Sequence, residues 1–361
     1  MMNQFKTFAA AVLSAVLFAA CSDSDEGGFN IRNIDASGNV LVVCQGNQGV
    51  KLPGTLDLYS ASQDTLFSSV FRAVNGADLG FSPQNAVVLG QRIYTAVFDE
   101  NMLLVTDKNS LALVDTIRVE QPQCVAADAR YVYVACNDGY VCRINPQSGE
   151  QQRLAVGPNP AGLAVSGDYL YVSISDGYNY SNNYANGLRV SRISMSDFKV
   201  DKEIGVGLNP GQMAVAADGS VFVVCNGNYA DVLPEVWRIA ADGEAKRFCS
   251  GSLVAAAASG VYVINSVTDW SDWQHPVTTT DCALYTADGA LRSDFALSEM
   301  PPQPTAIALS PEADRLYVAS DHAVGDFTSP GWLYVFTPEG RLISRKATGV
   351  HPFALLFVRG K

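Results

Sequence analysis

The chain has 361 residues, of which 48% are hydrophobic and 17% are charged, and this balance excludes an intrinsically disordered protein. Its 24 Lys and Arg against 36 Asp and Glu give a net charge of −12. Because nucleic-acid binding needs clustered basic side chains, the charge argues against a nucleic-acid partner. Beyond the N-terminus, no apolar run reaches the ~20 residues of a membrane-spanning helix. We therefore expect a folded, soluble domain with a sizeable core.

The N-terminal segment predicts export. Lys6 precedes an apolar stretch ending in Ala19-Ala20-Cys21, the pattern of a secretory signal peptide. A cysteine at this point resembles a lipoprotein signal, so we predict that residues 1–20 are removed and that Cys21 is acylated. The alternative is a plain signal peptide, with Cys21 as an incidental thiol. Residues 21–36 are expected to form a flexible, lipidated acidic tether.

The acidic residues of this tether resemble the surface-export signal of outer-membrane lipoproteins in some Gram-negative anaerobes. They predict an outer-membrane location, with the chain held by lipid alone and facing the cell exterior. Without such a signal, the expected location would be the periplasmic face.

An apolar pattern of four β-branched or aromatic residues recurs seven times, as in Val132-Tyr133-Val134-Ala135. The second residues stand at positions 41, 94, 133, 171, 222, 262 and 317, so the spacings are 53, 39, 38, 51, 40 and 55. A period near 39 residues is typical of one four-stranded propeller blade. We therefore predict an all-β, seven-bladed β-propeller of four-stranded blades over residues 37–361.

The two ends of the repeat predict how the ring closes. A proline-led strand precedes the later copies, beginning at Pro83, Pro160, Pro210 and Pro304. The first copy lacks such a strand, and the chain ends with an unmatched one at 352–357. Pairing this C-terminal strand into the first blade would hide two sheet edges. An open β-solenoid has no use for a strand displaced in this way.

Seven cysteines remain after Cys21, an odd number without Cys-x-x-Cys pairs. This pattern is neither a disulfide framework nor a zinc site. Most lie in apolar runs, so we expect buried thiols. A bridge between Cys124 and Cys136 on neighbouring strands stays open at this point.

In a propeller, the loops joining strands two and three gather on one face together with the connections between blades. The long spacings place insertions in such loops, at 45–54, 73–82, 176–187, 268–276 and 321–330. Aromatic side chains bury ~150–250 Å² each, so solvent-side rings there are costly unless they bind a ligand or pack the insertions onto the blades. The ligand-binding candidates are Tyr178, Tyr180, Asn182, Tyr184, Tyr229, Trp270, Trp273, His275, His322 and Phe327. We expect a platform for a planar or ring-shaped small molecule with a polar rim.

Signatures of catalysis are scarce. The chain has no Gly-x-Ser-x-Gly, P-loop or His-Glu-x-x-His motif. His275, His322 and His351 would have to converge to hold a metal, and Asp269 with Asp272 fits a solvated rim better than a glycosidase pair. We therefore expect no enzyme, no catalytic residues, no metal and no cofactor.

Several motifs carry a family resemblance across nearly the whole chain after Cys21. They lie at 43–47 with 56–59, at 71–76, at 318–321, and from 334–340 to 349–352. The chain resembles the lipid-anchored, YncE-like seven-bladed surface propellers of gut Gram-negative anaerobes. This group includes the BtuG-type proteins, which capture cobalamin above its outer-membrane transporter.

The resemblance implies a non-enzymatic surface lipoprotein that captures a small nutrient, with cobalamin or another corrinoid as the specific hypothesis and a TonB-dependent transporter as partner. Cys44-Gln45-Gly46 departs from the family's more usual Asn-Glu-Gly, and no ligand residue is mapped from the family. Two alternatives remain. The chain would be a protein-interaction platform at the outer membrane, or a metal-dependent propeller enzyme such as a lactonase or lyase.

Overall fold

The structure is a computed structural model that describes residues 36, 38–269, 271–272 and 274–358. These residues belong to one compact unit, 31–361. The predicted signal peptide, Cys21 and most of the predicted tether lie outside the described residues, as do Trp270 and Trp273. No helix within the described part is long and apolar enough to span a bilayer.

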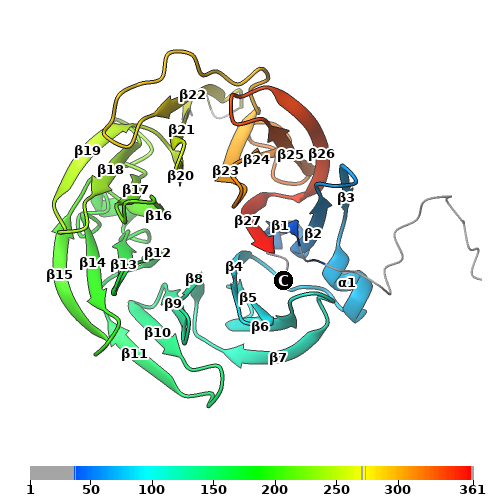
Figure 1. Cartoon of the computed structure of the whole chain (residues 1–361), viewed down its shortest axis with the longest axis vertical. Coiled ribbons are helices and arrows are strands. Elements are labelled where there is room, and N and C mark those ends of the chain that lie inside the picture. The colour runs from blue at the N-terminus through cyan, green and yellow to red at the C-terminus, as the bar shows by residue number, and fades with distance from the viewer. Residues whose placement is uncertain (1–35, 37, 270, 273, 359–361) are drawn as a thin grey trace, which may run out of the picture. The chain divides into compact units, whose positions relative to one another are not determined.

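Seven antiparallel sheets follow one another around a ring, which confirms the predicted seven-bladed propeller (Figure 1). Blade 1 comprises β27 (Pro352–Val358), β1 (Asn39–Cys44), β2 (Thr55–Ser60) and β3 (Thr65–Phe67). Blade 2 comprises β4 (Pro83–Leu89), β5 (Arg92–Val97), β6 (Met102–Asp107) and β7 (Leu113–Arg118). Blade 3 comprises β8 (Pro122–Ala127), β9 (Val132–Cys136), β10 (Tyr140–Ile144) and β11 (Gln151–Ala155).

The remaining blades continue in chain order. Blade 4 comprises β12 (Pro160–Ser166), β13 (Tyr169–Ile174), β14 (Arg189–Ser194) and β15 (Lys199–Gly205). Blade 5 comprises β16 (Pro210–Val215), β17 (Val221–Cys225), β18 (Glu235–Ile239) and β19 (Ala245–Ser250). Blade 6 comprises β20 (Leu253–Ala257), β21 (Gly260–Asp269) and β22 (Val277–Tyr285). Blade 7 comprises β23 (Gln303–Leu309), β24 (Leu316–Asp321), β25 (Pro330–Phe336) and β26 (Leu342–Val350).

The recurring apolar pattern forms the second strand of each blade, which packs against neighbouring blades on both of its faces. Every residue of β9, β17 and β24 is buried. A strand buried on both faces reads as a continuous apolar run rather than an alternation. Hydrophobic clusters join successive blades, such as the one uniting Val134 on β9 with Tyr94 on β5. Each fully buried Leu, Val or Phe contributes about 1.5–3 kcal/mol to folding.

Ring closure follows the prediction. The C-terminal strand β27 pairs antiparallel with β1, with Val42 opposite Leu355 and Leu41 opposite Leu356. Figure 1 shows β27, in red, beside β1, in blue. The first and last segments of the ring therefore share one sheet, in which β27 is the innermost strand and β1 is paired on both sides.

Six blades have four strands, and blade 6 has three. Its fourth strand is reduced to one antiparallel bridge between Tyr285 and Leu291. Beyond that bridge, Phe295 packs edge-on against Tyr262, with ring centroids 5.4 Å apart. The Ser298 N–H also donates to the carbonyl of Gly340 in blade 7. These contacts hold the chain away from the outer edge of β22.

Strands alternate in direction, so the loops joining strands two and three lie on the same side of the ring as the connections between blades. We call this side the upper face, and the opposite side the lower face. The upper face carries the short helix α1 (Val70–Asn75) and the 3-10 turns η2 (Gln48–Val50) and η3 (Tyr180–Asn182). The lower face includes the turns at 61–64 and 310–315 and the start of β1.

The seven cysteines among the described residues are unpaired, and five of them are buried. Cys124 and Cys136 form no bridge. Burial raises the pKa of Cys124 and of Cys142 to about 11 and that of Cys282 to about 12. The prediction of buried thiols is confirmed for Cys44, Cys136, Cys142, Cys225 and Cys249, whereas Cys124 and Cys282 are partly exposed.

Candidate ligand-binding site on the upper face

A repeated backbone geometry builds the mouth of the ring on the upper face. In five blades, the residue before the first proline of the inner strand has positive φ, between 46° and 57°. These residues are Ser82, Gln121, Asn159, Asn209 and His351. Each of their carbonyls accepts the backbone N–H of the residue that follows the second strand, which is Phe98, Asn137, Ser175, Asn226 or Gln45 respectively. The repeat therefore sets the same backbone geometry at the mouth of successive blades.

Amide side chains at and beside these positions form a hydrogen-bonded belt across blades 1 to 3, which the hydroxyl of Tyr178 joins to blade 4. Gln84 Oε1 accepts from Gln45 Nε2 at 2.9 Å and from Gln123 Nε2 at 3.1 Å. Asn137 Nδ2 donates to Gln123 Oε1 at 3.3 Å and to the hydroxyl of Tyr178 at 3.1 Å. We call Gln45, Gln84, Gln123 and Asn137 the amide belt. Its groups are neutral, and each amide carries both donors and acceptors.

Further amides extend the same chemistry to blades 4 and 5. Asn159 donates to the carbonyl of Asn137 at 3.0 Å and accepts the Tyr178 N–H at 3.0 Å. The insertion after β13 meets the insertion after β17 where Asn228 Nδ2 donates to Asn183 Oδ1 at 3.2 Å. The two insertions therefore form one surface, although their sequences are separated by a whole blade.

The structure divides the predicted aromatic residues into exposed and packed groups. Tyr178, Tyr180 and Tyr229 are 61%, 73% and 66% exposed, and Phe327 is 45% exposed. Tyr184 is buried and packs edge-on against Tyr229 at 6.1 Å, so it holds the two insertions together. Asn182 is exposed on η3.

The hydroxyl end of Tyr229 differs from its exposed ring. Burial raises the pKa of Tyr229, and a side-chain hydrogen bond with Asn209 opposes that shift. Tyr229 is therefore largely exposed, while its side chain bonds to Asn209 at the mouth of blade 5 and packs against Tyr184.

A second aromatic group lies where blades 7 and 1 meet. His351 stacks on Phe353 at 5.7 Å and contacts the edge of Phe327 at 6.1 Å. Its Nδ1 lies 2.8 Å from Oδ1 of the buried Asp321, which fixes the orientation of the imidazole. Asn47 Nδ2 donates to the carbonyl of Phe327 at 2.9 Å.

The other two predicted histidines have separate surroundings. His322 stacks on Trp332 at 5.6 Å and pairs through Nδ1 with the carbonyl of Pro330. His275 is exposed and lies 3.0 Å from Asp272 in the loop between β21 and β22. In the part of the chain that the structure describes, no group of three or more His, Cys, Asp or Glu side chains is placed to hold a metal ion.

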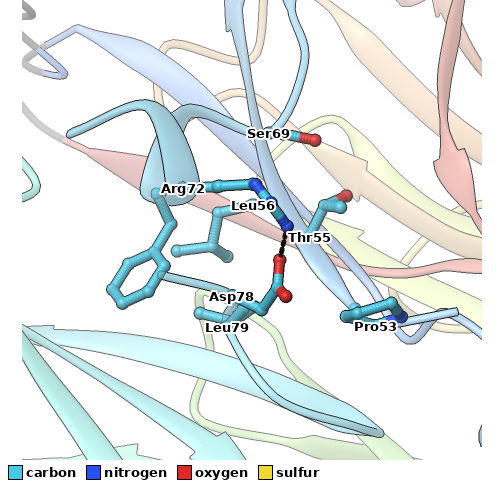
Figure 2. A pocket seen from close by; sticks show the side chains of 9 residues that line it. Pro53, Thr55, Leu56, Ser69, Arg72, Asp78 and Leu79 are labelled. Atoms are coloured by element: carbon cyan, nitrogen blue, oxygen red, sulfur yellow. Dashed lines mark hydrogen bonds and ion pairs between the residues drawn. The ribbon is translucent and has the colours of Figure 1, made fainter. Parts of the chain in front are cut away.

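A small cavity of about 160 Å³ lies on the upper face beside blade 1. Figure 2 shows Arg72 of α1 joined to Asp78, with Thr55 and Ser69 on one side and Leu56 and Leu79 beneath. Arg72 and Asp78 neutralise each other, so the cavity presents a paired charge rather than an open ionic site.

Asp57 lies buried behind this cavity and joins blade 1 to blade 7. Its Oδ1 accepts the Ser69 N–H at 2.8 Å, and its Oδ2 accepts the Gly349 N–H at 2.6 Å. Thr55 and Cys44 add side-chain contacts at 3.1 Å and 3.7 Å. Burial raises the pKa of Asp57, and these hydrogen bonds act against the shift.

The amide belt was missed by the sequence analysis, which searched the insertions rather than the inner strands. A signal existed. Gln84 and Gln123 each follow the first proline of an inner strand and are 39 residues apart, which is one blade period. Gln45 stands at a different place in its blade, because it follows the second strand β1 rather than a proline. Polar residues that recur at the blade period indicate a shared position at the mouth of the ring.

Comparisons with solved structures show the propeller fold. A quinoprotein alcohol dehydrogenase-like protein from Bacteroides thetaiotaomicron matches 91% of this chain and 80% of its own, with a TM-score of 0.64 and 14% identity. A functionally unknown protein from Desulfotomaculum acetoxidans matches 90% of this chain and 100% of its own, with a TM-score of 0.60 and 13% identity.

Hydrazine synthase from Kuenenia stuttgartiensis matches 75% of this chain and 88% of its own chain, with a TM-score of 0.58 and 15% identity. No protein-family model matches the chain, and no curated protein matches its sequence. The chain is therefore similar to these proteins in having a β-propeller fold, and at such low identity the likeness extends to the fold alone.

Proposed function

We propose that this chain is a non-enzymatic binding protein whose upper face captures a neutral small molecule. The observation that carries this proposal is the amide belt, which lies on the same face as the exposed rings of Tyr178, Tyr180, Tyr229 and Phe327. Amides supply donors and acceptors without charge, and exposed rings supply apolar area. A ligand with a flat apolar body and a polar, uncharged rim fits both.

A corrinoid is the specific ligand that we propose, because its macrocycle carries amide side chains around a large ring. The amides would pair with the belt, and the ring would cover the exposed aromatics. The family resemblance supports the same choice. A TonB-dependent outer-membrane transporter is the proposed recipient of the ligand.

Isothermal titration calorimetry of the purified chain with cyanocobalamin tests this ligand. We expect saturable heat for the natural chain and a weaker affinity for Tyr180→Ala combined with Phe327→Ala. Leu113→Ala is the matched control, because Leu113 is 41% exposed on the outer strand β7, away from the upper face. The absence of heat at micromolar ligand would remove the corrinoid from the proposal. If Leu113→Ala weakened the affinity as much as the double variant does, the assignment of the binding site to the upper face would be wrong.

We also propose that the chain is attached to the outer membrane through lipid on Cys21 and faces the cell exterior. Ala36 donates its backbone N–H to Asn109, and β1 begins at Asn39, both on the lower face. A tether that leaves from Ala36 would start on the side opposite the amide belt. Metabolic labelling with palmitate should be lost in Cys21→Ala, and protease added to intact cells should digest the natural protein.

A protein-docking platform is the second candidate, favoured by three exposed aliphatic side chains in the upper loops of blades 4 and 5. Leu188, Val232 and Leu233 are 48%, 40% and 58% exposed. Aliphatic side chains give no hydrogen bonds to a polar ligand, but they suit a protein partner. Leu188→Ser with Leu233→Ser should abolish co-purification of a transporter while leaving ligand heat unchanged. If the variant instead lost the ligand heat but still co-purified with the transporter, ligand capture alone would be favoured.

A further inference from the structure

The outer edge of β22 is open over its upper half. Within the described residues, β22 pairs with β21 on one side and has no partner strand on the other. The carbonyl of Leu284 accepts the Arg292 N–H, and the Thr286 N–H donates to Ala290, so even-numbered residues face the open edge. Because successive residues of a strand point their backbone groups to opposite sides, Thr278, Thr280 and Cys282 present N–H and C=O groups outward.

The other outer strands carry charges that block edge pairing. Lysine and arginine on an edge strand oppose the addition of another strand. β7, β11, β15, β19 and β26 each contain at least one Lys or Arg, and β3 has only three residues. The nine residues of β22, VTTTDCALY, include no basic side chain. Its three consecutive threonines favour the extended conformation.

The edge of β22 is open because contacts with blade 7 hold the segment that follows it in the chain. Phe295 and Leu297 pack into the cluster between blades 6 and 7, and Ser298 hydrogen-bonds to both Gly340 and Leu342. These anchors draw the connection toward blade 7 directly after Leu291. Among the residues that the structure describes, no strand therefore pairs with Thr278–Cys282 where the other blades have a fourth strand.

We propose that this edge binds an extended segment of a partner protein by strand addition, which completes blade 6 with a fourth strand. Backbone hydrogen bonds would supply the affinity, as in other peptide-recognition domains that add a strand to a sheet edge. Asp281 is exposed and has no ion-pair partner in the described structure, so the partner segment carries a basic residue opposite it. The chain's net charge of −12 favours a basic partner over a second copy of itself.

The test uses the purified chain and a fluorescein-labelled peptide, acetyl-TVKVTV-amide, measured by anisotropy and by residue-resolved hydrogen exchange. Adding the peptide should slow exchange of the Thr278, Thr280 and Cys282 amides, which exchange rapidly in the free chain. Thr280→Pro removes one outward N–H without breaking the ladder to β21, and it should weaken binding about tenfold. Thr280→Val is the matched control, because it loses the same hydroxyl but keeps the N–H, and its affinity should stay within about twofold.

Charge reversal supplies a second test. Asp281→Lys should reverse the preference, so that acetyl-TVEVTV-amide binds more tightly than the lysine peptide. Equal binding to Thr280→Pro and Thr280→Val would overturn the proposal, as would protection confined to residues outside β22. Absence of binding by either peptide would do the same. If these amides are already protected in the free chain and the protein sediments as a dimer, a second copy occupies the edge and a partner segment does not.

Discussion

Asp57→Asn tests whether the buried carboxyl stabilises the junction between blades 1 and 7. In the natural chain, the two oxygens of Asp57 accept the backbone N–H groups of Ser69 and Gly349, at 2.8 Å and 2.6 Å. Asparagine has almost the same shape but only one acceptor oxygen. One backbone N–H would therefore face an NH₂ group in a buried position, which costs about 1–3 kcal/mol.

The stability difference between the natural chain and Asp57→Asn should also depend on pH. Burial raises the pKa of Asp57 above the 3.8 of an unperturbed aspartate. The stability that Asp57 contributes is therefore fully present below the unfolded-state pKa and decreases as the pH rises through the folded-state pKa. Because asparagine does not titrate, the stability difference between natural chain and variant should be largest at mildly acidic pH and smaller at neutral pH.

Urea unfolding monitored by fluorescence between about pH 3 and pH 7.5 measures this difference. Asp64→Asn serves as a control of opposite sign on the same blade. Burial acts to raise the pKa of Asp64, but interactions with Ser344 and hydrogen bonds from Lys346 and Tyr59 outweigh it and lower the pKa. The contribution of Asp64 should thus decrease as the pH falls. If the free energy of unfolding of Asp57→Asn instead approaches that of the natural chain as the pH falls, the folded structure stabilises the ionised carboxylate and the reasoning is wrong.

Three further predictions address loop geometry, the core and the thiols. Gly227→Ala should distort the loop that carries Tyr229, because its φ is 68° and a Cβ would lie 1.9 Å from the carbonyl of Val232; Gly76→Ala, with φ of 68° and open space, should leave that loop's NMR shifts unchanged. Leu41→Ala, fully buried on β1, should lower the free energy of unfolding by about 2–5 kcal/mol in urea titration. Cys124, with a pKa of about 11, should resist Ellman's reagent at pH 8 until the chain unfolds.

The repeat predicted the fold well because it depends on burial, which leaves a direct trace in residue type. The second strands are covered on both faces and must be apolar throughout, as β17 shows with five buried residues. The unmatched strand starting at Pro352 predicted closure for the same reason, since its apolar residues needed a sheet. The missing fourth strand of blade 6 was not predictable in this way, because it depends on Phe295 packing against Tyr262 of the same blade and on Ser298 bonding to Gly340 of the next.

The candidate site was only partly predictable from residue type. The insertions that carry the large rings do lie together on the upper face, but residue type alone does not separate exposed Tyr180 from buried Tyr184. That distinction depends on Tyr229 and Asn228, which lie on the neighbouring blade. The role of these residues in ligand binding stays a prediction. The amide belt was overlooked because glutamine in a strand usually indicates a solvated position, whereas Gln84 is buried and bonded on both sides.

Ring closure through β27 has a mechanical consequence if the chain is held by its N-terminus, which is the attachment that we propose. A tether would reach the ring at Asn39, the first residue of β1. This strand is hydrogen-bonded on both sides, to β27 and to β2, so a pulling force would act along two ladders and shear them together. If the ring closed between complete blades, the tethered strand would instead be an inner strand with a ladder on one side only. Closure through β27 would therefore strengthen the lower-face attachment that we propose.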